Sequence, residues 1–394
     1  MNQYFLMHKD EVCGSLIIDE DTGVLTNYKD YHTGHSPFLG NADVKRMKRW
    51  WEGRAVPASR KMIQEVLKET GCFTTKEYMA KNLALSMTDS YWICPIDVQL
   101  KYDDVKLTGL SSYNEGKIPY HNHTSYDPNA SLGGQMEKYW DIKVVPPVLI
   151  KESYKYFGQQ AINEGFATLV HERLEAGIPY TSYDVDRTDD GGSYCSCPAF
   201  TGEDIEFVPA YEVIEGSKLR NDMSMYENYI QICASLGIEE DIMRGFMDYQ
   251  TLTDFMISNT DEHLLNFGIL RNPDTMRYIG PAPIFDSGNS MFYTDSSRRY
   301  TRTELLERKI TSFSDSEEKM LKNVRNKAMI DPCLAPSQEG VIEYYTGHGF
   351  PEERASMIAA NYETKIEMTR EFCQGGKISL YYEKNKRMPI VKLS

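Results

Sequence analysis

Two stretches of the chain decide the fold class: ISNTDEHLLNFGIL at residues 257–270 and PIFDSG at residues 283–288. An apolar run with helical spacing, residues 252–257, leads into the first stretch, whose last residues are apolar enough for a β-strand. A turn at residues 272–274 (Asn-Pro-Asp) then leads into a second strand, which we expect to end at Asp286. The pattern predicts a buried helix, a polar loop, and a hairpin whose second strand ends on a carboxylate.

The polar residues of these stretches have the chemistry that phosphoryl transfer from ATP requires. The reaction needs a carboxylate that orients the acceptor hydroxyl and accepts its proton, and it needs oxygen ligands for Mg²⁺. Asp261 suits the first task, whereas Asn266 in the same loop can bind metal without adding charge. Asp286 can bind the metal that bridges the phosphates. Because protein-kinase catalytic loops share this D-x-x-x-x-N spacing, we predict a phosphotransferase that uses ATP and Mg²⁺.

His263 stands inside the same loop, and two roles fit it. It can orient Asp261 or touch the transferred phosphate, or it can make a structural hydrogen bond that holds the loop backbone. We include it among the candidate catalytic residues, but not as a base. The structural alternative to the whole site is a polar loop with a buried aspartate, followed by a strand-end aspartate that caps a turn.

A glycine turn, a strand lysine and a helix glutamate precede this segment. Gly133 and Gly134 can adopt positive φ and approach a phosphate closely, and backbone N–H groups in such a turn form an anion-binding nest. The apolar strand 144–151 ends on Lys151, and the next helix carries Glu164, which we expect in its first turn. In kinases the strand lysine contacts the α- and β-phosphates, and a helix glutamate holds it. Ordinary strands and helices contain such residues too, so the order of the three features carries the prediction.

A strand at residues 205–210 runs into a connector. By its position it corresponds to the hinge of a kinase, where backbone groups meet adenine. We therefore predict that Phe207 and Ala210 contact the cofactor.

Composition limits the classes of function. The chain has 394 residues, which predicts two or three lobes, and 41% hydrophobic residues, which argues against bulk disorder. The formal net charge of −15 comes without a dense Lys/Arg block, which argues against direct nucleic-acid binding. No apolar run reaches the roughly 18 residues of a membrane helix, and no secretory signal is evident. With scattered cysteines, these features predict a cytoplasmic protein.

The motifs resemble those of the HipA-like kinase family, which includes bacterial toxin kinases and stand-alone CtkA-type relatives. The family loop Asn/Thr-Asp-x-His-x-x-Asn is matched by residues 260–266, and its Tyr/Phe-Asp strand end by residues 285–286. The upstream pattern Ser-x-x-Gly-x-Gln-x-Lys is matched by Ser131, Gly134 and Lys138. Met136 stands where the family has glutamine, with Gln135 one place earlier, and Lys151 matches the ATP lysine. The resemblance covers roughly residues 131–375 and is strongest around 257–288.

The resemblance implies an α+β, two-lobed protein-kinase-like fold. We expect residues 1–120 to form an N-terminal strand and helix region packed on the small lobe, residues 121–212 a β-rich N-lobe, and residues 213–394 a mostly helical C-lobe. It further implies that the chain transfers the γ-phosphoryl group of Mg²⁺-ATP to serine or threonine of a protein. Ser131 is then a candidate for autophosphorylation, which would block the ATP phosphates. Alternatively, Ser131 only caps the glycine turn.

Two other functions stay open. Phosphatidylinositol kinases also use Asp-x-His-x-x-Asn, so a small-molecule or lipid kinase is one alternative, although the acidic charge balance offers no basic membrane-facing patch. A catalytically silent ATP-binding or partner-binding module is the other. A separate antitoxin-like chain is implied as a partner, because no helix-turn-helix with basic recognition residues stands out in this chain.

Overall fold

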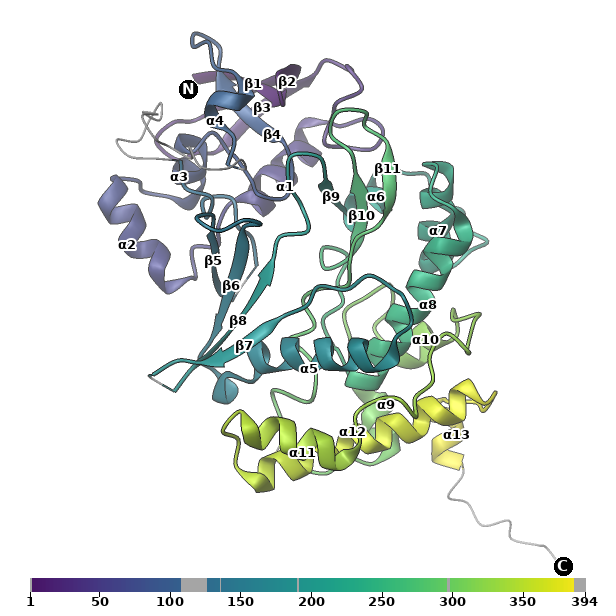
Figure 1. Cartoon of the computed structure of the whole chain (residues 1–394). Coiled ribbons are helices and arrows are strands. Elements are labelled where there is room, and N and C mark those ends of the chain that lie inside the picture. The colour runs from purple at the N-terminus through teal and green to yellow at the C-terminus, as the bar shows by residue number, and fades with distance from the viewer. Residues whose placement is uncertain (1, 108–125, 135, 190, 296–297, 386–394) are drawn as a thin grey trace, which may run out of the picture.

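The computed structural model describes residues 2–107, 126–134, 136–189, 191–295 and 298–385. These residues form antiparallel sheets and helices, which is the mixed α and β content that the sequence predicts. Figure 1 shows the N-terminal sheet near the top of the view and the helices of residues 302–385 in its lower part. Among the described residues, no helix is both long and apolar enough to cross a membrane.

The N-terminal sheet has the strand order β3-β2-β1-β4. Its strands are β1 (Asn2–His8), β2 (Glu11–Ile18), β3 (Leu25–Asp30) and β4 (Tyr91–Pro95). Alternating apolar residues bury one face of this sheet against α1 (Val44–Arg54), α3 (Thr75–Lys81) and α4 (Tyr102–Val105), whereas α2 (Lys61–Thr70) packs on Tyr78 of α3 in a separate apolar cluster. Asp43 caps α1 by accepting from the Arg46 N–H, and Gly71 ends α2 at a positive φ of 66°.

Two further sheets carry the candidate site residues. The four-stranded sheet has the order β5-β6-β8-β7, and the three-stranded sheet has the order β11-β10-β9. The strands are β5 (Glu137–Asp141), β6 (Val148–Ser153), β7 (Asp184–Arg187), β8 (Ser193–Pro198), β9 (Glu206–Pro209), β10 (Gly268–Arg271) and β11 (Tyr278–Pro281). A 3-10 turn (Tyr156–Gly158) leads into helix α5 (Gln159–Leu174), which lies beside this four-stranded sheet (Figure 1).

The second half of the chain is mostly helical. Its helices are α6 (Ala210–Glu215), α7 (Met225–Ser235), α8 (Glu240–Ile257), α9 (Arg302–Glu307), α10 (Glu317–Leu321), α11 (Gln338–Gly347), α12 (Glu352–Cys373) and α13 (Leu380–Asn385). The apolar sides of α7, α8, α11 and α12 form one core with α5, around Phe166, Tyr229 and Tyr362. This core fixes α8, and therefore the polar loop that follows it.

Helix α2 begins at Lys61, after a turn over residues 57–60 that is closed by a hydrogen bond from the Arg60 N–H to the Pro57 carbonyl. One predicted strand boundary is wrong. The strand expected over 144–151 spans Val148–Ser153, so Lys151 lies inside it.

Two errors of position concern the site. Helix α5 begins at Gln159, so Glu164 lies in its second turn rather than its first. The strand before Asp286 ends at Pro281, and only an isolated bridge joins Ile284 to Tyr180 on the way to Asp286. Asp286 therefore stands in irregular backbone with a positive φ of 64°.

Candidate active site

Lys151 is the centre of a buried cluster of charged groups. Its side chain is 2% exposed, and Nζ donates to Glu164 Oε1 and to Asp286 Oδ1, each at 2.7 Å. The Tyr183 hydroxyl lies 3.2 Å from the same nitrogen. Three residues that the sequence placed in one site, on β6, on α5 and after β11, therefore meet at one ammonium group.

Opposite charges control the ionisation of this cluster. Burial alone would lower the pKa of Lys151 and raise that of Asp286, but their mutual attraction, joined by Glu164, holds the pKa of Lys151 well above its usual value. Lys151 and Lys138 likewise hold the pKa of Asp286 well below its ordinary range. Burial raises the pKa of Glu164 to about 7, although Lys151 opposes it. Asp286 is thus a permanent anion beside a permanent cation.

Lys138 adds a second ammonium group. It lies on β5 directly opposite Lys151 on β6, and burial lowers its pKa to about 8, against the attraction of Asp286. Gly134 has a positive φ of 88°, and a Cβ atom built there would lie 2.5 Å from Lys138 Nζ. The positive φ favours glycine here, and the absence of a Cβ atom leaves room for the ammonium group. Two lysines and a glycine turn face one place, as an anion-binding site requires.

Ser131 begins the turn that we call the glycine loop (residues 131–134). The Ser131 side chain is 9% exposed, and its hydroxyl has no hydrogen-bond partner among the described residues. The structure therefore gives no support to a capping role for this hydroxyl. Met136 is described, whereas Gln135 lies outside the described residues.

The predicted catalytic residues lie in a short connection between α8 and β10, which we call the Asp261 loop (residues 260–266). Asn289 Nδ2 donates to Asp261 Oδ2 at 2.7 Å, so one carboxylate oxygen is fixed and Oδ1 is left for another donor. Asn266 Nδ2 donates to the Asp261 carbonyl at 2.8 Å, which makes Oδ1 the atom that Asn266 can offer to a cation. Asp261 and Asn266 are thus positioned by each other and by Asn289.

His263 makes contacts of a structural kind. The Leu265 N–H donates to His263 Nδ1 at 3.3 Å, and the Asn266 N–H donates to the His263 carbonyl at 2.7 Å. These bonds hold the backbone of the Asp261 loop in a turn. The geometry favours the structural role of His263 over contact with the transferred phosphate.

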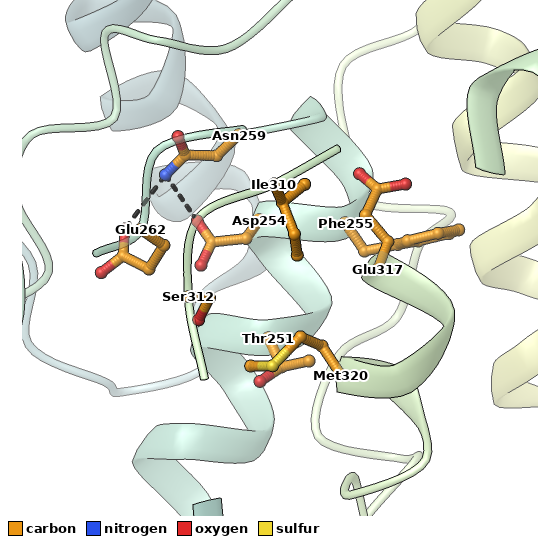
Figure 2. Close-up of a pocket in the computed structure, with 9 residues that line it drawn as sticks. All are labelled: Thr251, Asp254, Phe255, Asn259, Glu262, Ile310, Ser312, Glu317 and Met320. Carbon is orange, nitrogen blue, oxygen red and sulfur yellow. Dashed lines mark hydrogen bonds between the residues drawn. The ribbon is translucent and has the colours of Figure 1, made fainter. Parts of the chain in front are cut away.

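Two carboxyl groups joined by an asparagine support the Asp261 loop. We call these three residues, Asp254, Asn259 and Glu262, the carboxyl cluster. Asn259 Nδ2 donates to Asp254 Oδ1 and to Glu262 Oε2, both at 3.0 Å, as Figure 2 shows. Asn259 Oδ1 accepts from the Asp261 N–H at 3.2 Å, and Gln250 holds the other oxygen of Glu262. Burial raises the pKa of Asp254 to about 7 and that of Glu262 well above its usual value. The Asp261 backbone is therefore tied to a cluster that holds protons at neutral pH.

Helix α5 connects the two halves of the site. Besides Glu164, it carries Gln160, whose Nε2 donates to Asn289 Oδ1 at 2.6 Å, and Asn163, whose Nδ2 donates to the Gly288 and Ser290 carbonyls. Glu164 Oε2 accepts from the Ser287 N–H at 2.8 Å. One helix face thus fixes both the lysine partner and the segment that follows Asp286.

The backbone N–H groups of the two predicted hinge residues are already bonded within the protein. The Phe207 N–H donates to the Thr88 carbonyl, and the Ala210 N–H donates to the Phe267 carbonyl, both at 2.9 Å. Ala210 is also fully buried at the start of α6. The ring of Phe207 instead packs edge-on against Phe285, with ring centroids 5.5 Å apart, one residue before Asp286. Phe200 packs against both of these rings, so the three form an aromatic wall beside Asp286.

Sequence reasoning missed Asn289, Tyr183 and Phe200. Asn289 had a weak signal, because it directly follows the Asp-Ser-Gly segment, whereas Tyr183 and Phe200 lie in stretches without a motif. The predicted metal residues do not form a dedicated cage, since no group of three or more His, Cys, Asp or Glu side chains in the described part of the chain is arranged to hold a metal ion. Asp286 and Asn266 fit Mg²⁺, which commonly takes one or two protein ligands and completes its shell with phosphates and water.

Solved structures include 29 chains that match this one. No family model and no curated protein matches the chain. Among solved structures, it is similar to the Helicobacter pylori proinflammatory kinase CtkA, with 15% sequence identity, a TM-score of 0.43, and coverage of 62% of this chain and 93% of that chain. It is also similar to a chain of the Shewanella oneidensis MR-1 toxin–antitoxin complex of HipA, HipB and operator DNA, with 12% identity, a TM-score of 0.49, and coverage of 97% and 99%. The neighbours thus carry the two names, HipA and CtkA, that the motifs suggested.

Proposed function

We propose that this chain is a kinase that transfers the γ-phosphoryl group of Mg²⁺-ATP to a serine or threonine hydroxyl of a protein. The observation that carries the proposal is the position of Lys151 between Glu164 and Asp286, each 2.7 Å away. A lysine held by a helix glutamate, beside a carboxylate suited to Mg²⁺, is the arrangement that phosphoryl transfer from ATP requires. The two-lobed organisation expected for residues 1–120, 121–212 and 213–394 belongs to the same proposal.

The nucleotide would be held at two ends. Lys138, Lys151 and the N–H groups of the glycine loop supply positive charge for the phosphates, and Phe207 and Phe285 supply an aromatic wall on which adenine can stack. Asp286 and Asn266 would hold Mg²⁺, which neutralises charge that develops on the phosphates.

Asp261 would orient the acceptor hydroxyl. Asn289 occupies Oδ2, so Oδ1 is the oxygen that can accept the proton of the hydroxyl as it attacks. The carboxyl cluster fixes the backbone of Asp261 through Asn259. A small-molecule or lipid hydroxyl could occupy the same position, but the net charge of −15 favours a protein acceptor over an anionic membrane surface.

Ser131 remains our candidate for autophosphorylation. Its hydroxyl is buried, so the glycine loop must move outward before the modification, and a phosphate of about −2 charge would then keep the loop out of the ATP site. A separate antitoxin-like chain is the proposed partner. We predict that this chain does not itself contact nucleic acid, although the HipA neighbour was solved with HipB and operator DNA.

Intact-mass measurement tests the proposal. Purified protein incubated with Mg²⁺-ATP should gain the mass of one phosphoryl group, and Asp261→Ala should gain none. Loss of the gain in Ser131→Ala would identify Ser131 as the acceptor. No gain, combined with ATP turnover only on added small molecules, would establish the small-molecule kinase instead. ATP binding without transfer to any acceptor would establish the silent module.

A further inference from the structure

Arg60 stands directly before α2, and its guanidinium is buried against the glycine loop. The side chain is 4% exposed. Its Nη2 lies 2.7 Å from the Leu132 carbonyl oxygen, 2.7 Å from that of Gly133 and 2.9 Å from that of Gly134. Nε donates to the Gly134 carbonyl at 3.2 Å, and Nη1 donates to the Lys138 carbonyl at 3.3 Å. One side chain thus binds three successive carbonyl groups of the glycine loop, those of residues 132–134.

This contact determines where the amide groups of the glycine loop point. In a trans peptide the N–H and C=O groups point in opposite directions. Because the Leu132 and Gly133 carbonyls face Arg60, the Gly133 and Gly134 N–H groups face away from it. Neither N–H has an acceptor in the part of the chain that the structure describes. Lys138 Nζ lies beside Gly134, so the free N–H groups and an ammonium group are close together.

The N-terminal region builds the outer wall of this loop around Arg60. The Gly53 carbonyl at the end of α1 packs closely against Gly133, because a Cβ atom built on Gly133 would lie 3.3 Å from its oxygen. The Val56 N–H donates to the Ala130 carbonyl at 3.2 Å. The Lys61 N–H, at the start of α2, donates to Glu137 Oε1 at 2.6 Å, and Figure 1 shows α2 beside β5.

We propose that Arg60 is a positioning residue for ATP: it fixes the glycine loop so that the Gly133 and Gly134 amides face the nucleotide phosphates. This inference rests on the proposed ATP site and gives the N-terminal region a task in it. Arginine suits the role because its planar guanidinium has five donors in a fixed arrangement, whereas lysine has three donors on one flexible ammonium group. Arg60 acts through the loop and does not itself touch the nucleotide.

Calorimetric titration with Mg²⁺-ATP and with adenosine tests this role in Arg60→Lys and Arg60→Gln. The matched control is Arg54→Lys, because Arg54 is also buried in the N-terminal region and donates to Asp89 and to the Ala84 and Tyr91 carbonyls, but not to the glycine loop. Because Arg60→Lys loses several charged hydrogen bonds to the glycine loop, it should raise the Kd for ATP by about 10-fold or more. Adenosine, which lacks phosphates, should bind all variants alike.

The outcomes separate this inference from the proposed kinase activity. Wild-type ATP affinity in folded Arg60→Lys or Arg60→Gln overturns the role of Arg60, and so does an equal loss of affinity in Arg54→Lys. An equal loss of adenosine and ATP binding in the Arg60 variants also overturns it, because a general structural defect then explains the result. If the ATP-specific loss occurs but no acceptor is ever phosphorylated, the inference about binding stands and the kinase proposal fails.

Discussion

The carboxyl cluster beneath the Asp261 loop makes stability depend on pH in an unusual direction. Burial raises the pKa of Asp254 from 3.8 to about 7. Between pH 4 and pH 7 the folded protein therefore holds a proton that the unfolded chain has lost, so the free energy of unfolding falls as pH rises. The loss of stability above pH 7 is at most on the order of 4 kcal/mol, because the side chain is half-buried and shares the cluster with Glu262.

Asp254→Asn removes that titration and keeps the shape of the side chain. An asparagine Oδ1 can still accept from Asn259 Nδ2, as Asp254 does at 3.0 Å. The variant should match the wild type near pH 4 and should become more stable by up to about 4 kcal/mol above pH 7. Phosphoryl transfer should continue, because Asn259 still holds the Asp261 N–H.

Thermal unfolding from pH 4 to pH 8 measures the effect. Asp184→Asn is the control, because Asp184 is exposed on β7 and its substitution should leave the pH profile parallel to that of the wild type. A constant difference between Asp254→Asn and the wild type at every pH would refute the reasoning. A variant that is less stable at pH 8 than at pH 4 relative to the wild type would refute it as well.

Three other perturbations follow from the geometry. Because the pKa of Lys138 is about 8, kcat/KM for ATP should fall as pH rises through 8, and Lys138→Met should show a low, flat profile in the same steady-state assay. Asn289→Ala removes the hydrogen bond of 2.7 Å that holds the Asp261 carboxylate, so kcat should fall by about 10-fold or more while KM for ATP changes little. An unchanged kcat would contradict the orienting role of Asn289. Glu206 is fully buried against His8 and Arg271, so Glu206→Gln should cost about 3–5 kcal/mol of unfolding free energy at pH 7. That loss should shrink in acid, because the pKa of Glu206 is lowered to about 2, and denaturant unfolding at pH 7 and below pH 3 measures both values.

The sequence predicted features that depend on neighbours in the chain. The helical spacing of residues 252–257 indicated the end of α8, and the apolar run before Lys151 indicated β6. The candidate residues Lys151, Glu164 and Asp286 were found from motif order, since each stands at a recognisable place in a strand, a helix or a turn. The structure brings these three side chains together.

Contacts between distant segments could not be predicted in this way. Nothing in the turn before α2 indicates that Arg60 meets carbonyl groups more than seventy residues away, with sequence separations of 72 to 78. Phe207 was predicted to meet adenine through its backbone, but the Thr88 carbonyl from the N-terminal region accepts its N–H. Such partners are fixed by how the sheets pack against each other, which a single sequence does not reveal without the fold.

The central claim is tested most directly with ATP that carries a radioactive label on its γ-phosphoryl group. The measurement is the transfer of this label to protein. We predict that wild-type protein incorporates acid-stable label into serine or threonine of protein when Mg²⁺ is present. Asp261→Asn should reduce the initial rate by about 10²-fold or more, because it removes the oxygen that accepts the hydroxyl proton. Equal rates in the wild type and Asp261→Asn would contradict the account. So would the absence of labelled protein when wild-type protein that binds ATP is incubated with a cell lysate.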